Sequence, residues 1–307
     1  MNFQQLRIIR EAVQQNFNLT EVAAALFTSQ SGVSKHIKDL EDELGVELFV
    51  RRGKRLLGLT EPGKELAVIV DRMLLDARNI KRLAEQFSNS EQGRLTIATT
   101  HTQARYALPQ VVARFKAAYP RVHLVLHQGS PAEIVSMLQS GEADIGIATE
   151  ALDSVDPFVT FPFYDWHHAV VVPEGHPLAA VQPLTLEALA EHPLITYHEG
   201  YTGRARIDAT FAGAGLSPDI VMSALDADVI KTYVQIGLGV GIVAAMAVEP
   251  QRDPGLQLLP AQHLFSANTT RIALRRGHYL RGYAYRFLQE CREDLDEDTV
   301  KAAIATE

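Results

Sequence analysis

The sequence predicts an α/β protein with a small, mainly helical N-terminal domain that carries a β-hairpin, one long linker helix and a two-lobed α/β domain. Three observations favour this organisation. The chain has 307 residues, about twice the ~150 residues of a typical single domain. Short amphipathic helices and a basic hairpin fill residues 1–60, whereas strands and helices alternate from residue 93 onward. Between them, residues 61–92 carry a regular, heptad-like apolar pattern.

The composition is that of a globular protein from a reducing compartment. Hydrophobic residues make up 47% of the chain and charged residues 21%, which excludes disordered, collagen-like and fibrous classes. The single cysteine, Cys291, has no intrachain disulfide partner. The N-terminus lacks the apolar run of a signal peptide, and the apolar stretch 237–248 is too short to cross a bilayer. We therefore expect a soluble cytoplasmic protein with no membrane partner.

Charge is distributed unevenly along the chain. The net charge of -8 by itself disfavours a nucleic-acid partner. Residues 1–92 carry 13 Lys/Arg and 13 Asp/Glu, whereas residues 93–307 carry 16 and 24, so the negative excess lies entirely in the second part. The neutral part also holds a cluster of four cations within residues 51–55. A solvated turn would explain this cluster on its own, so the neighbouring elements decide its meaning.

Residues 1–45 are predicted to form three helices. The second is about two turns long and begins after a cap at Asn18 or Thr20. A bend at Phe27 and Thr28 leads into a longer third helix that stops at Gly45. The apolar residues expected to face the core are Leu6, Ile9 and Val13 in the first helix, Val22, Ala23 and Leu26 in the second, and Val33, Ile37, Leu40 and Leu44 in the third.

The third helix and the hairpin after it predict a winged helix-turn-helix that binds double-stranded DNA. Short polar and basic side chains on the exposed helix face suit hydrogen bonding to base edges and phosphates in a major groove. Cations at the tip of the hairpin suit contacts with the DNA backbone or the minor groove. A generic small helical domain is the alternative. The candidate DNA-binding residues are Ser29, Gln30, Ser31, Ser34, Lys35, Arg51, Arg52, Lys54 and Arg55.

Residues 61–92 are predicted to form a linker helix that dimerises the chain. Pro62 is tolerated in its first turn. Its apolar residues follow a strict 4-3-4-3-4-3 spacing over about three heptads, as in a two-helix coiled coil. A helix packed on its own chain is the alternative. The residues concerned are Leu66, Val70, Met73, Ala77, Ile80, Ala84 and Phe87.

Residues 93–307 are predicted to form an effector-binding domain of two α/β lobes, similar in layout to periplasmic binding proteins. A βαβαβ unit is followed by a second α/β series, and the last strand and helix are expected to return to the first lobe. Lobe I then covers about 93–163 and 267–292, and lobe II about 164–266, with two crossings between them. The acidic tail from Glu293 is expected to be a solvated end.

Loops at the carboxyl ends of the strands are where lobes of this kind hold ligands. The loop after the first strand places hydroxyl groups before a helix, whose N-terminus favours an anion. Neutral donors can hold a fully ionised tetrahedral anion such as sulfate. A simple N-cap is the alternative for Thr100 or Thr102. The candidate effector-binding residues are Thr100, Thr102, Gln103, Thr149 and Thr202.

The sequence offers no catalytic or metal-binding motif. It contains no GxSxG, no HExxH, no Walker A loop and no GxGxxG after a strand. His167 and His168 are adjacent in a predicted strand, so they point to opposite sides and do not readily share a metal. We expect no enzymatic activity and no cofactor beyond a small-molecule effector. A ligand-binding module without a DNA role and an enzyme with an unrecognised site are the alternatives.

The chain resembles the LysR-type transcriptional regulators over essentially its whole length. The resemblance rests on residues 22–64, VAAALFTSQSGVSKHIKDLEDELGVELFVRRGKRLLGLTEPGK. Phe27 stands where many helix-turn-helix proteins have glycine, but LysR-type chains commonly lack that glycine. The residues in the expected places are Ser29, Gln30, Ser34, Leu40, Glu41, Leu44, Gly45, Leu48, Phe49, Arg51, Leu59, Thr60 and Gly63.

Within this family, the segments TTHTQARYALP, RRGKRLLGLTEPGK, IATE and YHEGYTGR look like the CysB group of sulfur-assimilation and cysteine-biosynthesis regulators. The resemblance implies sulfate between the lobes, on the five effector-binding residues named above. It also implies gene activation in response to sulfate, acetylserine or adenosine phosphosulfate, a homotetramer, and promoter binding upstream of RNA polymerase. A regulator of sulfonate or other organosulfur use would carry nearly the same motifs.

Overall fold

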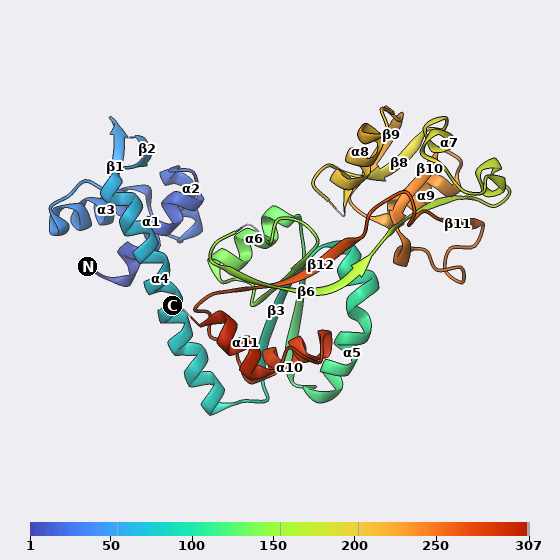
Figure 1. Ribbon diagram of the computed structural model, residues 1–307. Helices are drawn as coiled ribbons and strands as arrows, with labels where there is room; N and C mark the ends of the chain where they lie inside the picture. Colours follow the sequence, from blue (N-terminus) through green and yellow to red (C-terminus); the bar gives the residue numbers. More distant parts are fainter. Residues whose placement is uncertain (54, 154, 202, 306–307) are drawn as a thin grey trace. The chain divides into compact units, whose positions relative to one another are not determined.

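The computed structural model describes residues 1–53, 55–153, 155–201 and 203–305. Two candidate binding residues, Lys54 and Thr202, therefore lie outside the described residues. The chain divides into two compact units, Met1–Ala84 and Glu85–Glu307 (Figure 1). Within the described ranges, no helix combines the length and apolar character needed to cross a membrane.

The first unit has the predicted winged helix-turn-helix topology. It contains the helices α1 (Phe3–Gln14), α2 (Leu19–Ala25) and α3 (Gln30–Leu44), and a hairpin of β1 (Phe49–Arg52) and β2 (Arg55–Leu59). The long helix α4 (Glu61–Ser88) follows and continues into the second unit. Side chains of Asn18 and Ser29 cap α2 and α3, and α3 ends at Gly45 in the left-handed conformation.

The turn between α2 and α3 is made by a residue other than glycine. Phe27 adopts a φ of 51°, a left-handed conformation that is costly for residues with a Cβ atom. Its side chain is 97% exposed, so the unusual backbone causes no clash in the core. The amides of Phe27 and Thr28 donate to the carbonyls of Ala24 and Ala23 at 3.2 and 2.9 Å, which satisfies the end of α2.

The core of the first unit differs from the expected apolar faces at two positions. Val13 and Leu44 are exposed, because each lies at the last turn of its helix, where the chain leaves the core. Ile8 and Ala12 are buried in α1 in addition to the predicted residues. The core comprises Leu6, Ile8, Ile9, Ala12, Leu19, Val22, Ala23, Val33, Ile37, Leu40, Leu48, Phe49, Leu56, Val70 and Leu74.

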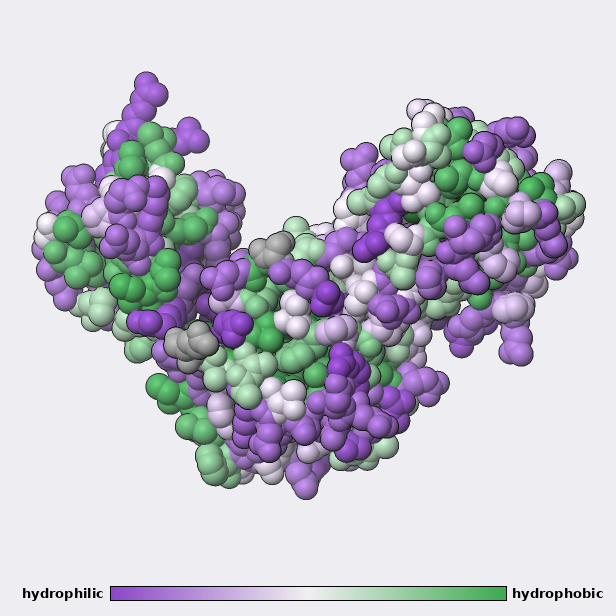
Figure 2. All heavy atoms as spheres, in the orientation of Figure 1, coloured by the Kyte–Doolittle hydropathy of each residue, from purple (hydrophilic) through white to green (hydrophobic). Residues whose placement is uncertain are grey.

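Helix α4 uses its apolar stripe in two ways. Val70 is buried in the core of the first unit, and Leu66 and Met73 pack against that core. The expectation of a dimer contact along the whole stripe is therefore wrong for this half, where the helix packs on its own chain. Farther along, Ile80, Leu83 and Phe87 are exposed, with Phe87 at 85%. Figure 2 shows hydrophobic side chains at the surface over the C-terminal part of α4.

Lobe I is built on a five-stranded sheet with the order β4-β3-β5-β12-β6. Strand β3 (Gly93–Thr99) runs parallel to β4 (Val122–Gln128) and β5 (Ile145–Ala148), whereas β12 (Asn268–Arg275) runs antiparallel to β5 and β6 (Phe158–Trp166). A π-helical turn η1 (Gln103–Ala107) leads into α5 (Leu108–Ala118). The other helices are α6 (Pro131–Ser140), α10 (Gly282–Cys291) and α11 (Glu297–Ile304).

Lobe II has a second five-stranded sheet with the order β11-β7-β10-β8-β9. Strand β8 (Leu194–Tyr197) is parallel to β9 (Ile220–Ala224) and β10 (Val240–Ala244). Strand β7 (His168–Pro173) is antiparallel to β10 and β11 (Leu256–Pro260). The helices are α7 (Leu186–Ala190), α8 (Arg204–Gly213) and α9 (Ala227–Gln235), with short 3-10 turns η2 (Pro177–Ala180) and η3 (Ala245–Ala247).

The chain crosses between the lobes at β6–β7 and again at β11–β12. The sequence did not predict strand β6, which extends the lobe I sheet to Trp166, beyond the expected boundary near residue 163. The expected solvated tail is also wrong. Leu295, Val300 and Ile304 are buried in the core of lobe I, because α11 presents an apolar face to it.

The hairpin is attached to α3 by one carboxylate. Glu41 Oε1 accepts the amides of Leu48 and Phe49 at 2.8 and 3.2 Å, and Glu41 Oε2 forms a 2.5 Å ion pair with Arg51 Nη2. The Glu41 side chain is only 10% exposed. It therefore fixes the position of the hairpin relative to α3.

Replacing Glu41 with alanine should loosen the base of the hairpin without unfolding the helices. Hydrogen bonds to a charged group contribute about 1.5–3 kcal/mol, so hydrogen exchange of the Leu48 and Phe49 amides should accelerate by roughly tenfold or more. Amide exchange followed by NMR or mass spectrometry measures this. Asp42→Ala, an exposed neighbouring carboxylate, is the control, and equal exchange in both variants would contradict the assigned role.

Candidate functional site

The exposed face of α3 carries the predicted DNA-reading residues. Ser29, Gln30, Ser31 and Lys35 are exposed, and Ser34 is half-buried. Ser29 Oγ accepts the Gly32 amide at 3.1 Å and lies 3.1 Å from Ser31 Oγ, so Ser29 also begins the helix. The N-terminal turn of α3 is thus a polar surface with donors and acceptors of the kind that read base edges.

The hairpin adds positive charge beside this surface. Arg52 and Arg55 are exposed, whereas Arg51 is held by Glu41 and is the least available of the three described arginines. Arg55 and Gln30 line one cavity of about 380 Å³, together with Asn18 and Thr20 at the start of α2. Residues from α2, α3 and the hairpin therefore converge on one cavity, whose lining also includes Phe17, Leu19 and Leu56.

The candidate effector residues lie where β3 ends. Thr100, Thr102 and Gln103 are each at most 4% exposed. The Thr99 hydroxyl donates to the Ile147 carbonyl at 2.9 Å and so joins this loop to β5. Thr102 precedes η1, yet its side chain makes no capping hydrogen bond, which argues against the simple N-cap alternative. Its Oγ1 is buried and forms no hydrogen bond of good geometry among the described residues, although the Tyr197 hydroxyl of lobe II lies close to it.

Gln103 is oriented by an aromatic residue from a distant strand. The Tyr164 hydroxyl, on β6, donates to Gln103 Oε1. Burial raises the pKa of Tyr164 to about 12, so the phenol keeps its proton at neutral pH. Because the amide oxygen is occupied, the Nε2 side of Gln103 is the side that can donate to an anion.

Thr149 belongs to a chain of hydroxyl groups at the crossing strands. Trp166 Nε1 donates to Thr270 Oγ1 at 3.1 Å, and Thr270 Oγ1 lies 3.3 Å from Thr149 Oγ1. Since Thr270 accepts from Trp166, it can donate its own proton to Thr149, which leaves the Thr149 proton for a ligand.

Lobe II faces this group with Tyr197 and Gly203. The Tyr197 hydroxyl accepts the Ala244 amide at 3.0 Å, and burial raises its pKa. The Gly203 amide donates to Glu150 Oε1, which directly links the two lobes. Gly203 has a φ of 73°, and a Cβ there would lie 2.7 Å from Asn268 Oδ1, so only glycine fits.

The sequence predicted the strand-end threonines as candidate ligand residues but did not predict the residues that hydrogen-bond to Gln103 and Thr149. Tyr164, Trp166 and Thr270 come from β6 and β12, and β6 was not predicted. Tyr164 and Trp166 could have indicated this strand. They are two residues apart and so lie on one face of a strand, and each carries a polar group that needs a hydrogen-bond partner when it is buried.

The two parts of the chain match two descriptions of one family. Residues 3–64 match "Bacterial regulatory helix-turn-helix protein, lysR family", and residues 88–296 match "LysR substrate binding domain". Both matches agree with the winged helix-turn-helix unit and the two-lobed domain of the structure.

Individual relatives are similar over nearly the whole chain. HTH-type transcriptional regulator SsuR from Burkholderia cenocepacia is 61% identical over 297 residues, which cover 97% of this chain and 96% of that protein. HTH-type transcriptional regulator CysB from the same organism is 52% identical over 307 residues, covering 100% and 98%. The crystal structure of the cofactor-binding domain of the Cbl transcriptional regulator is 52% identical with a TM-score of 0.67, covering 69% of this chain and 94% of that one. The chain therefore belongs to the LysR family of bacterial transcriptional regulators and is similar to members of its CysB group.

Proposed function

We propose that this LysR regulator activates genes of sulfur assimilation and cysteine biosynthesis when a small oxyanion binds between its lobes. The observation that carries the proposal is the group of buried neutral donors after β3, above all the Thr102 hydroxyl. Neutral donors suit an anion that stays fully ionised, such as sulfate. The candidate effectors are sulfate, acetylserine and adenosine phosphosulfate, held by Thr100, Thr102, Gln103, Thr149 and Thr202.

A regulator of sulfonate or other organosulfur use is the second candidate. A sulfonate group has three oxygens on a tetrahedral sulfur and would accept hydrogen bonds from the same donors as sulfate. Thr100, Thr102 and Gln103 would therefore bind either group. Comparing sulfate with simple sulfonates as ligands distinguishes the two candidates.

On the DNA side, the proposed assembly is a homodimer through the exposed half of α4, with two dimers forming a homotetramer on promoter DNA upstream of RNA polymerase. Exposed Ile80, Leu83 and Phe87 support this dimer surface. A dimer presents two recognition helices to two half-sites. The exposed residues Ser29, Gln30, Ser31 and Lys35 would face the major groove, with Arg52, Lys54 and Arg55 on the flanking backbone.

The proposed signal passes from lobe I to α4. Arg281 Nη2 donates to the carbonyls of Glu85 and Asn89 at 3.1 and 2.5 Å, which satisfies the end of α4. The Gly282 amide donates to Gln86 Oε1 at 3.1 Å. Through these hydrogen bonds to the end of α4, a change in lobe closure would be transmitted to the linker helix. An effector produces this change only if it binds the two arrangements with different affinity.

Replacing Arg55 with alanine should weaken DNA binding in a salt-dependent manner. Loss of one phosphate contact lowers the slope of log affinity against log salt by about one. Fluorescence anisotropy with a labelled duplex at several salt concentrations measures this slope. Arg252→Ala, which removes the same charge from an exposed site in lobe II, should leave the slope unchanged. A wild-type slope in Arg55→Ala would remove the hairpin from the DNA contact.

Replacing Thr102 with alanine should weaken sulfate binding while leaving DNA affinity unchanged. A hydrogen bond to a charged ligand contributes about 1.5–3 kcal/mol, so the sulfate Kd should rise roughly tenfold or more. A thermal-shift titration of the full chain measures it, since ligand at 100 times its Kd stabilises wild type by ~2.7 kcal/mol. Thr102→Ser retains the hydroxyl and should retain binding. The anion site is refuted if Thr102→Ala titrates like wild type.

A further inference from the structure

A second polar cluster lies immediately beside the proposed anion site. His101, between Thr100 and Thr102 in lobe I, faces Asp226 and Asp228 at the start of α9 in lobe II. One ligand atom from each of these three residues lies within 4.8 Å of the others. The Nδ1 atom of His101 is buried and has no hydrogen-bond partner among the described residues. Residues of both lobes therefore meet at one group of acceptors.

Helix capping explains only part of this arrangement. Asp226 Oδ1 accepts the Val229 amide at 2.9 Å, so Asp226 begins α9, and this capping bond involves one of its two oxygens. A cap needs neither a second carboxylate nor an imidazole from the opposite lobe. The buried Thr102 hydroxyl lies close to the Tyr197 hydroxyl, and, besides burial, the Asp226 carboxylate raises the pKa of Tyr197, so Thr102 and Asp226 both lie near this phenol.

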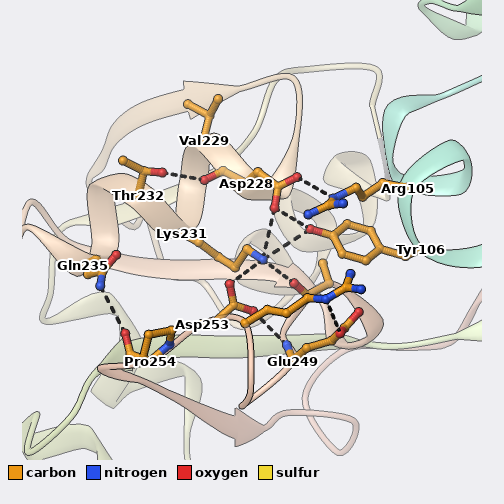
Figure 3. Close-up of polar contacts among 12 residues, drawn as sticks. Arg105, Tyr106, Asp228, Val229, Lys231, Thr232, Gln235, Glu249, Asp253 and Pro254 are labelled. Atoms are coloured by element: carbon orange, nitrogen blue, oxygen red, sulfur yellow. Dashed lines mark hydrogen bonds and ion pairs between the residues drawn. The ribbon is translucent and has the colours of Figure 1, made fainter.

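The charges around the cluster determine what kind of ligand fits. Asp228 accepts the Tyr106 hydroxyl at 2.7 Å and pairs with Lys231 at 3.2 Å and Arg105 at 3.3 Å. Lys231, with its side chain 8% exposed, also pairs with Asp253 at 2.8 Å and donates to the Ala247 carbonyl (Figure 3). Burial opposes ionisation of Asp228, but these hydrogen bonds and cations outweigh it and lower the Asp228 pKa.

The carboxylates outnumber the cations by one. Asp226, Asp228 and Asp253 stand against Arg105 and Lys231, while Glu249 and Arg252 pair with each other at 3.2 Å. A single positive charge would balance the cluster, whereas a divalent metal ion would reverse its sign. A primary ammonium also has three donors, which match the imidazole nitrogen and the two carboxylates.

We infer that His101, Asp226 and Asp228 form an ammonium subsite beside the anion site, so that the preferred effectors are small zwitterions with an oxyanion and a primary amine on a short spacer. This inference rests on the proposed anion site. Thr102 of the anion site and His101 of the ammonium subsite are consecutive residues, whose Cα atoms are about 3.8 Å apart. A short spacer between the oxyanion and the amine is therefore long enough to reach both. A zwitterion would bind both lobes at once: its anion contacts the lobe I threonines, and its ammonium contacts α9 of lobe II.

The test compares two ligands that differ at one position. Isothermal titration of the full chain with 2-aminoethanesulfonate and with 2-hydroxyethanesulfonate should show the amine binding about tenfold or more tightly, because a charged donor replaces a neutral one. Asp226→Asn keeps a good helix cap but removes the charge, and it should abolish this preference. Sulfate should bind Asp226→Asn at least as tightly as wild type, because a nearby negative charge is gone.

Asp219→Asn is the matched control, since this exposed aspartate lies at the opposite end of β9 from Asp226. It should retain the wild-type preference for the amine. The ammonium subsite would be overturned if wild type bound the two sulfonates equally, or if Asp226→Asn still preferred the amine. The anion site would stand in either case, provided that sulfate binds. Failure of sulfate and both sulfonates to bind would overturn both. Stabilisation by Mg²⁺ or Mn²⁺ that depends on Asp226 would overturn the subsite in favour of a metal site.

Discussion

The paired crossing of β6 and β12 is the constraint on which the effector-binding unit depends. The two strands lie antiparallel, with Asn268 opposite Trp166 and Arg275 opposite Phe158, and they continue into lobe II through β7 and β11. Backbone hydrogen bonds along this pair hold the crossing segments together, so the lobes can move chiefly by bending where the strands end. The proposed ligand site lies at that point, where a small change in closure alters its contacts most.

The strands β6 and β12 also carry side chains that hydrogen-bond to residues of the proposed effector site. Tyr164 and Trp166 on β6 and Thr270 on β12 orient Gln103 and Thr149, so two of the proposed ligand donors are positioned by the strands that connect the lobes. Tyr106 of lobe I packs against the apolar core of lobe II, and several other contacts between the lobes are polar. Tyr106 and Arg105 reach Asp228, and Glu150 reaches Gly203. Hydrogen bonds of this kind can exchange with a ligand at low net cost, which suits an equilibrium between two arrangements.

Local signals in the sequence were sufficient to predict much of the fold and to place the candidate threonines after β3. The cap at Asn18, which was one of two expected positions, the stop at Gly45 and the position of the threonines after β3 each depend on neighbouring residues, and all were predicted. Strand β6 was missed because Pro162 interrupts its pattern and its pairing partner follows about a hundred residues later. The sequence also did not predict that the first half of the apolar stripe of α4 packs on its own chain while the second half is exposed. The spacing of apolar residues does not reveal whether the same chain or another chain covers them.

The most direct test of the account is the distance between the lobes with and without sulfate. Spin labels at exposed positions 142 in lobe I and 257 in lobe II, in a Cys291→Ser background, allow this distance to be measured by pulsed electron paramagnetic resonance on the full chain. If the ligand acts through lobe closure, saturating sulfate shifts the distance distribution of wild type to a shorter, narrower range, and Thr102→Ala needs roughly tenfold or more sulfate for the same shift. An unchanged distribution in wild type with sulfate bound would contradict the claim that the ligand acts through lobe closure.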